Sequence, residues 1–199
     1  MTTDAVRIVA EPQTNTSCRF VVDRPLYPKA SFFFATKEQS QESALARRIF
    51  DLEGVTSVLL SHDQVTVGQG GFADWRDIGP RIGAAIRDYL ASGEPAVSEQ
   101  LRQSLPPAEV IRQRVQDVLD EEVNPAVGQH GGFVRLVDVR ENAIFIQMGG
   151  GCQGCGMAKM TLRNGVETAI RRGVPEVGAI FDATDHASGE SPYYASSNR

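Results

Sequence analysis

Cys152 and Cys155 are the residues of this chain whose type and spacing best suit chemistry. They lie in a glycine-rich run, residues 148–157 (MGGGCQGCGM), between a strand-like segment and a helix-like one. The two-residue gap lets both sulfurs face one centre, and thiolates are soft ligands that favour iron–sulfur clusters, zinc or copper(I). The glycines permit backbone angles that other residues avoid. The positive end of the following helix lowers thiol pKa values, which helps metal binding and redox chemistry alike.

The cysteine pair supplies only half of the ligands that such a centre needs. A tetrahedral zinc site or a cubane cluster usually takes four protein ligands. The third cysteine, Cys18, lies in the other half of the chain. A symmetric homodimer supplies four thiolates at its two-fold axis, and two-fold contacts are the commonest in oligomers. The spacing alone leaves open a shared cluster, a structural zinc-bridged dimer and a dithiol–disulfide oxidoreductase.

The segments around the cysteines have the periodicity of regular elements. Segments in which apolar and polar residues alternate predict the two strands of a hairpin, and apolar residues at helical spacing predict helices. Asn124-Pro125 is expected to end or bend the first helix. The inward face of the second helix is predicted to carry Ala158, Leu162, Val166 and Ile170. The predicted elements are a helix at 109–123, strands at 133–139 and 143–148, a helix at 157–172 and a strand at 177–183.

The first half of the chain is predicted to be a second small domain. Its predicted elements are strands at 5–10, 18–23 and 31–35, a helix at 42–52, and a hairpin of strands at 55–60 and 64–67. Asp74 is a candidate N-cap for a further helix with Ile82 and Ile86 on its apolar stripe. Pro80 conflicts with that helix, so it either kinks there or begins near Gly79. A polar, proline-containing stretch at 93–107 predicts a linker.

Composition limits the classes of function. The 199 residues are 41% hydrophobic, which is ordinary for a globular protein of one or two domains. The net charge of −5 argues against nucleic acid as a partner, because phosphate contacts need clustered lysine and arginine. No apolar stretch is long enough to span a membrane, and the N-terminus lacks a signal-peptide pattern. We therefore expect a cytoplasmic protein with reduced thiols and no membrane partner.

The remaining cysteine and the histidines have simpler explanations than metal binding. Cys18 lies in a strand-like run and is expected to be a small buried hydrophobic residue. His62 lies in a predicted turn and is expected to face solvent. His186 lies in the C-terminal tail without a nearby acidic residue at ligand spacing. His130 belongs to a predicted turn, QHGG, and receives no ligand role.

The second half of the chain resembles the NifU-like C-terminal domain of the Nfu family. The resemblance rests on the segment 123–127 (VNPAV), the turn 129–132 (QHGG), the strand 134–139 (VRLVDV) and the run 150–157 (GGCQGCGM). The C-terminal residues, from 183 onward, resemble those of a bacterial branch of the family. The first half is similar to the Nfu N-terminal domain through 52–58 (LEGVTSV), 65–67 (VTV) and Asp74-Trp75.

This resemblance implies a fold, a function and a site. It implies an α+β protein with an Nfu N-terminal-like domain at 1–92, a linker at 93–107, a NifU-like cluster-binding domain at 108–184 and a flexible tail at 185–199. It implies a non-enzymatic carrier that binds a 4Fe-4S cluster between two subunits through Cys152 and Cys155. The partners implied are a second copy of the chain, an upstream cluster donor and apo-proteins that receive the cluster.

Overall fold

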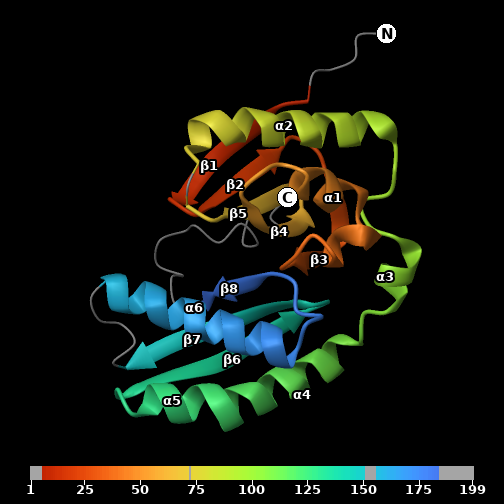
Figure 1. Cartoon of the computed structure of the whole chain (residues 1–199). Coiled ribbons are helices and arrows are strands. Elements are labelled where there is room, and N and C mark those ends of the chain that lie inside the picture. Colours follow the sequence, from red (N-terminus) through yellow and green to blue (C-terminus); the bar gives the residue numbers. More distant parts are fainter. Residues whose placement is uncertain (1–5, 72, 151–155, 184–199) are drawn as a thin grey trace, which may run out of the picture. The chain divides into compact units, whose positions relative to one another are not determined.

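The computed structural model describes residues 6–71, 73–150 and 156–183, with only the backbone of residues 156–162. The chain divides into two compact units, Met1–Leu105 and Pro106–Arg199, which are described separately (Figure 1). Each unit combines helices with a β-sheet, so the α+β prediction is confirmed. No helix within the described ranges has the length and apolar character needed to cross a membrane.

The first unit is an antiparallel sheet with two main helices. Its strands pair in the order β1-β2-β5-β4-β3, with every pair antiparallel. Residues alternate between buried and partly exposed along β2 and β5, because successive side chains of a strand point to opposite faces. The elements are β1 (Ile8–Thr14), β2 (Ser17–Val22), β3 (Tyr27–Phe34), η1 (Gln39–Glu42), α1 (Ala44–Phe50), β4 (Val55–His62), β5 (Gln64–Gln69), α2 (Trp75–Ser92) and α3 (Glu99–Gln103).

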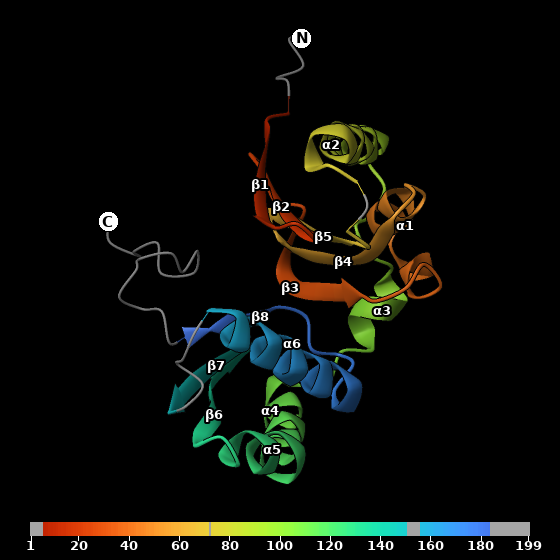
Figure 2. The ribbon, with the colours of Figure 1, turned by 60° about the vertical axis from the view of Figure 1, so that its left-hand side comes forward.

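Helices α1 and α2 bury apolar residues in one core with this sheet (Figure 2). The predicted strand at 5–10 is displaced: β1 begins at Ile8 and continues to Thr14, where it still pairs with β2. The predicted strand at 31–35 begins earlier, at Tyr27, because β3 pairs with β4 from that residue onward across a register shift.

Helix α2 begins at Trp75, so the alternative of a start near Gly79 is wrong. The Asp74 side chain accepts a hydrogen bond from the Arg76 backbone N–H at 2.9 Å, which confirms the predicted N-cap. Pro80 lies inside the helix and is exposed. A proline in a helix interior costs about 3 kcal/mol. Burial of Ile78, Ile82 and Ile86 on the apolar stripe, each worth roughly 1.5–3 kcal/mol, exceeds that cost.

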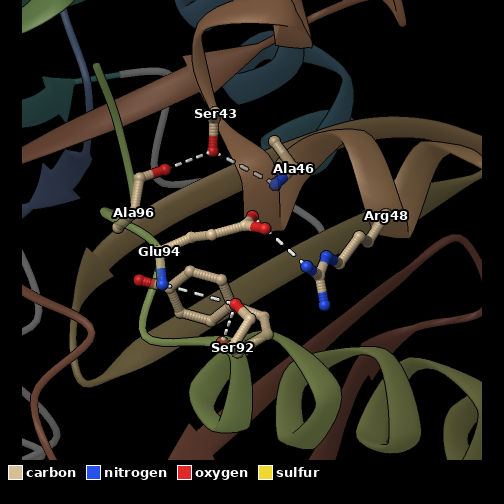
Figure 3. Close-up of polar contacts among 7 residues, drawn as sticks. Ser43, Ala46, Arg48, Ser92, Glu94 and Ala96 are labelled. Carbon is tan, nitrogen blue, oxygen red and sulfur yellow. Dashed lines mark hydrogen bonds and ion pairs between the residues drawn. The ribbon is translucent and has the colours of Figure 1, made fainter.

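The stretch that the sequence predicted as a linker is largely attached to the first unit (Figure 3). Ser43 caps α1 by accepting from the Ala46 N–H, and its hydroxyl donates to the Ala96 carbonyl at 2.6 Å. Arg48 and Glu94 form an ion pair at 3.2 Å. Ala96 and its neighbour Val97 are buried in the first core. Residues 94–98, named here the strap, are therefore held in place by side-chain contacts, and α3 follows them.

The second unit is a three-stranded sheet with helices packed on one face. The strands follow the order β6-β7-β8, with β6 and β7 antiparallel and β7 and β8 parallel. Its core joins residues of both long helices to β7, for example Val115, Ile170 and Ile144. The elements are α4 (Ala108–Val118), the π-helical turn η2 (Leu119–Val123), α5 (Asn124–Gly128), β6 (Gly132–Arg140), β7 (Ala143–Gly150), α6 (Gly156–Gly173) and β8 (Ile180–Asp182).

Two predicted boundaries in this unit differ from the structure. Of the two alternatives at Asn124-Pro125, the end of the first helix is wrong, since the chain stays helical to Gly128. The π-helical turn bonds the Asn124 N–H to the Leu119 carbonyl, five residues back, and this wider turn accommodates the proline. The last strand is shorter than predicted and spans only Ile180–Asp182, where it pairs with β7.

Candidate metal centre

The candidate ligands lie between two elements that the structure describes. Strand β7 ends at Gly150 and helix α6 begins at Gly156. Cys152 and Cys155 fall between them, outside the described residues, so their role as ligands stays a prediction. The described flanks show how the chain enters and leaves this loop.

The last residue of the strand before the loop accepts only glycine. Gly150 has φ +67°, a left-handed angle that glycine adopts without strain. A Cβ atom there would also lie 2.2 Å from the Gly131 carbonyl oxygen. Gly149 is constrained by space, because a Cβ atom there would lie 2.2 Å from the ring Cζ of Phe133. The prediction that these glycines permit backbone angles that other residues avoid is confirmed at Gly150. Gly149 instead leaves room for an aromatic ring.

Asn124 fixes the other side of this strand end, and sequence reasoning missed it. Its side-chain amide donates to the Val134 carbonyl at 3.0 Å and accepts from the Val134 N–H at 2.8 Å. Strand β6 is an edge strand, so these backbone groups have no strand partner on that side. The two hydrogen bonds tie α5 to β6 and so position the connecting turn, which includes Gly131, against Gly150. In the sequence, only the position of Asn124 before a proline at a predicted helix end could have pointed to a structural role for its side chain.

Helix α6 begins at Gly156, the residue that follows Cys155 in the sequence. Its first turn contains no acidic residue, so no carboxylate there offsets the partial positive charge of the helix end. That charge stabilises a thiolate more than a thiol. This helix end therefore favours an anionic group over a neutral one.

The C-terminal end of α6 is anchored by Arg171. Its guanidinium donates to the carbonyls of Val177 and Gly178 at 3.0 and 2.8 Å. Burial lowers the pKa of Arg171 to about 10, against the opposing effect of Glu167. Arg172 forms an ion pair with Glu122 on the π-helical turn. Cations at the C-terminal end of a helix complement its dipole, and Arg171 also makes direct hydrogen bonds to the chain leading to β8.

The other cysteine and histidines do not gather into a site. Cys18 is fully buried in the first core, as predicted, and burial raises the pKa of its thiol to about 11. His62 is exposed at the end of β4, with Nδ1 3.5 Å from the Asp63 carboxylate. His130 is exposed in the turn after α5, and His186 lies outside the described residues. The described residues contain no group of three or more potential ligands for a metal ion.

Comparison with protein families matches both halves of the chain. Residues 115–181 match the model of the NifU-like domain, and residues 7–93 match the model described as scaffold protein Nfu/NifU N terminal. The first match contains the cysteine loop, Asn124 and the strand end at Gly150. The second covers all five strands of the first unit and both its main helices.

Curated relatives share these regions. The Fe/S biogenesis protein NfuA of Stenotrophomonas maltophilia is 37% identical over 135 residues, which are 67% of this chain and 66% of the relative. NfuA of Ectopseudomonas mendocina is 36% identical over 143 residues, or 66% of this chain and 72% of the relative. The human mitochondrial NFU1 iron-sulfur cluster scaffold homolog is 29% identical over 178 residues, which are 87% of this chain and 70% of the relative. The chain thus spans about two thirds of the length of these relatives.

Among solved structures, the chain is similar to the solution structure of a NifU-like protein from Saccharomyces cerevisiae. The TM-score is 0.44 and the sequence identity 21%, with 50% of this chain and 91% of the yeast chain covered.

Proposed function

Because this chain belongs to the Nfu family of iron–sulfur biogenesis proteins, we propose that it is a carrier of 4Fe-4S clusters. Cys152 and Cys155 of one chain and the same pair of a second chain bind the cluster between them. The cluster is cargo: the carrier receives it from an upstream donor and passes it to apo-proteins. The carrier itself is not an enzyme, and its first unit serves contact with donors or acceptors.

One observation carries this proposal. A pair of cysteines lies between a strand end that only glycine can form and a helix N-terminus without acidic residues, within the region that matches the NifU-like domain. Two thiolates per chain are half of what a cubane cluster takes from protein. A two-fold dimer supplies the other half without any further ligand.

Transfer from such a site is an exchange of ligands. Each bond between iron and a carrier thiolate breaks as a cysteine thiolate of the acceptor forms the replacing bond. The proton released by each acceptor thiol is taken up by the departing carrier thiolate or by solvent. The cluster moves intact, and no electron is gained or lost in the exchange.

Anaerobic reconstitution with iron and sulfide tests the proposal. A shared cubane cluster of the cysteine-ligated type corresponds to about two irons and two sulfides per chain, with broad visible absorbance. Native mass spectrometry should find the iron-loaded species with two chains. A colourless protein with half an equivalent of zinc would instead indicate a zinc-bridged dimer. Turnover of a disulfide substrate without either metal would indicate an oxidoreductase.

Cysteine variants give the matched control. Cys152→Ser and Cys155→Ser should each abolish cluster binding and the dimer that depends on it. Cys18→Ser should retain both, because Cys18 is buried in the core of the other unit. Loss of the cluster in the Cys18 variant would contradict the ligand assignment, as would an iron-loaded species that contains one chain.

A further inference from the structure

The chain that joins the two units is short, because both of its ends are packed. Leu105 packs against the core of the first unit, and Ala108 packs against the core of the second. Between them lie Pro106 and Pro107, and the Pro107 carbonyl already accepts hydrogen bonds from the first turn of α4. Proline fixes φ, so this pair is a stiff connection. The path from Leu105 to Ala108 spans at most about 11 Å.

This connection is short only while the strap and α3 stay on the first unit. Val97 of the strap is 2% exposed in the first core, and Leu101 of α3 is partly buried against the same core. The Ser98 N–H donates to the Glu42 carbonyl at 2.8 Å, and the Ser98 hydroxyl donates to the Glu42 carboxylate. The same hydroxyl accepts from the Leu101 N–H at 3.0 Å and so caps α3.

These shared contacts make the strap and α3 dock or release together. Helix α3 has five residues, and isolated helices of that length do not persist in water. Its cap, Ser98, is also a docking residue, so release of the strap removes the cap and the Leu101 contact at once. Residues 94–107 then form one flexible chain, which averages roughly 20 Å end to end and reaches about 50 Å when extended.

We propose that the strap and α3 act as a latch that sets the reach between the two units. With the latch closed, the units are joined by Pro106-Pro107 and tumble together. With the latch open, residues 94–107 join them and each unit moves by itself. The latch opens by local unfolding, while the rest of the first core stays folded. It needs no cluster, so it goes beyond the proposed function and does not depend on it.

Trypsin cleavage after Arg102 measures how often the latch opens. Arg102 lies in α3 and is the single lysine or arginine in residues 88–111, so mass spectrometry of the digested apo chain follows this one bond. Cleavage of a transiently opened segment tracks the population of the open form. Val97→Ala and Ser98→Ala weaken the latch at two different contacts. Val22→Ala is the matched control, because Val22 is also 2% exposed in the first core but lies on β2.

The expected result is faster cleavage in the latch variants alone. Val97→Ala should raise the rate at Arg102 about fivefold or more, and Ser98→Ala about threefold or more. Val22→Ala should stay within about twofold of wild type, because the latch contacts remain in place. Equal rates in Val97→Ala and wild type would overturn the latch. Equal acceleration in Val22→Ala would also overturn it, because cleavage would then follow unfolding of the whole unit.

Tumbling of the first unit tests the effect on reach. Trp75 is the single tryptophan and lies in this unit, so the decay of its fluorescence anisotropy reports how the unit rotates. The double variant Ala96→Asp, Val97→Asp places two charges in the core and should hold the latch open. Its anisotropy should decay faster than that of the wild-type chain, and equal decay would overturn the inference. If circular dichroism showed this variant to be unfolded, the cleavage rates of the single variants would still decide. Either result leaves the proposed function untouched.

Discussion

Replacing Asn124 with alanine should destabilise the second unit selectively. The substitution removes both hydrogen bonds to Val134, of 2.8 and 3.0 Å, and Val134 is only 2% exposed. Each hydrogen bond contributes about 1 kcal/mol net, and a buried group left without a partner costs about 1–3 kcal/mol. We therefore expect the free energy of unfolding to fall by about 2–4 kcal/mol. For a unit of this size, 2 kcal/mol corresponds to a decrease in Tm of roughly 8–16 °C.

The chain offers a probe that separates the two units. Trp75 is the single tryptophan, and its indole N–H donates to the Thr14 carbonyl at 3.0 Å inside the first unit. Its fluorescence therefore reports unfolding of the first unit, while far-ultraviolet circular dichroism reports both. Each unit has its own core. Asn124→Ala should therefore lower the unfolding temperature of the second unit, which is seen by circular dichroism, and leave the Trp75 fluorescence transition of the first unit unchanged.

Two further variants serve as controls for the Asn124→Ala prediction. Gln113→Ala removes an amide hydrogen bond of 2.8 Å to Asp117 on the exposed side of α4, and should cost less than about 0.5 kcal/mol. Asn124→Asp keeps an acceptor for the Val134 N–H but places a carboxylate oxygen against the Val134 carbonyl, so it should not rescue stability. A loss below about 0.5 kcal/mol in Asn124→Ala would refute the role assigned to this side chain. An equal shift in the Trp75 transition would refute the independence of the units.

Two more predictions concern the first unit. Ser43→Ala removes the cap on Ala46 and the bond to Ala96, so the Trp75 transition should lose about 2 kcal/mol while the second unit is unchanged; a loss under about 0.5 kcal/mol would mean that Ser43 does not hold the strap. The raised pKa of the Cys18 thiol, about 11 against an ordinary 9.0, predicts no alkylation of Cys18 at pH 8 in the folded chain, measured by mass spectrometry. Because the folded pKa lies above the unfolded value, stability should be constant below pH 9.0 and fall as the pH rises toward about 11. Cys18→Val should reduce that alkaline loss, and rapid labelling of native Cys18 would contradict its burial.

Hydrophobic periodicity predicted most elements of the fold. The helix at 157–172 is α6 with one residue added at each end, and the hairpin at 133–139 and 143–148 is β6 and β7. Those patterns are local, since each records which face of one element meets a core. The sequence did not decide features that depend on contacts distant in sequence. Pro80 stays inside α2 because buried isoleucines outweigh its cost, and the strap joins the first unit because Ser43 bonds to Ala96.

The cysteine pair and its glycines were evident from the sequence, because residue type and spacing alone specify which ligands a loop can offer. The tertiary structure decided which neighbours surround those glycines. Gly149 faces the Phe133 ring and Gly150 faces the Gly131 carbonyl, and neither neighbour is close in sequence to the glycine that it constrains. It also assigned Asn124 to the edge of β6. Close contacts across a sheet depend on which residues of two strands pair with each other. That register is set when the chain folds and cannot be read from a single sequence.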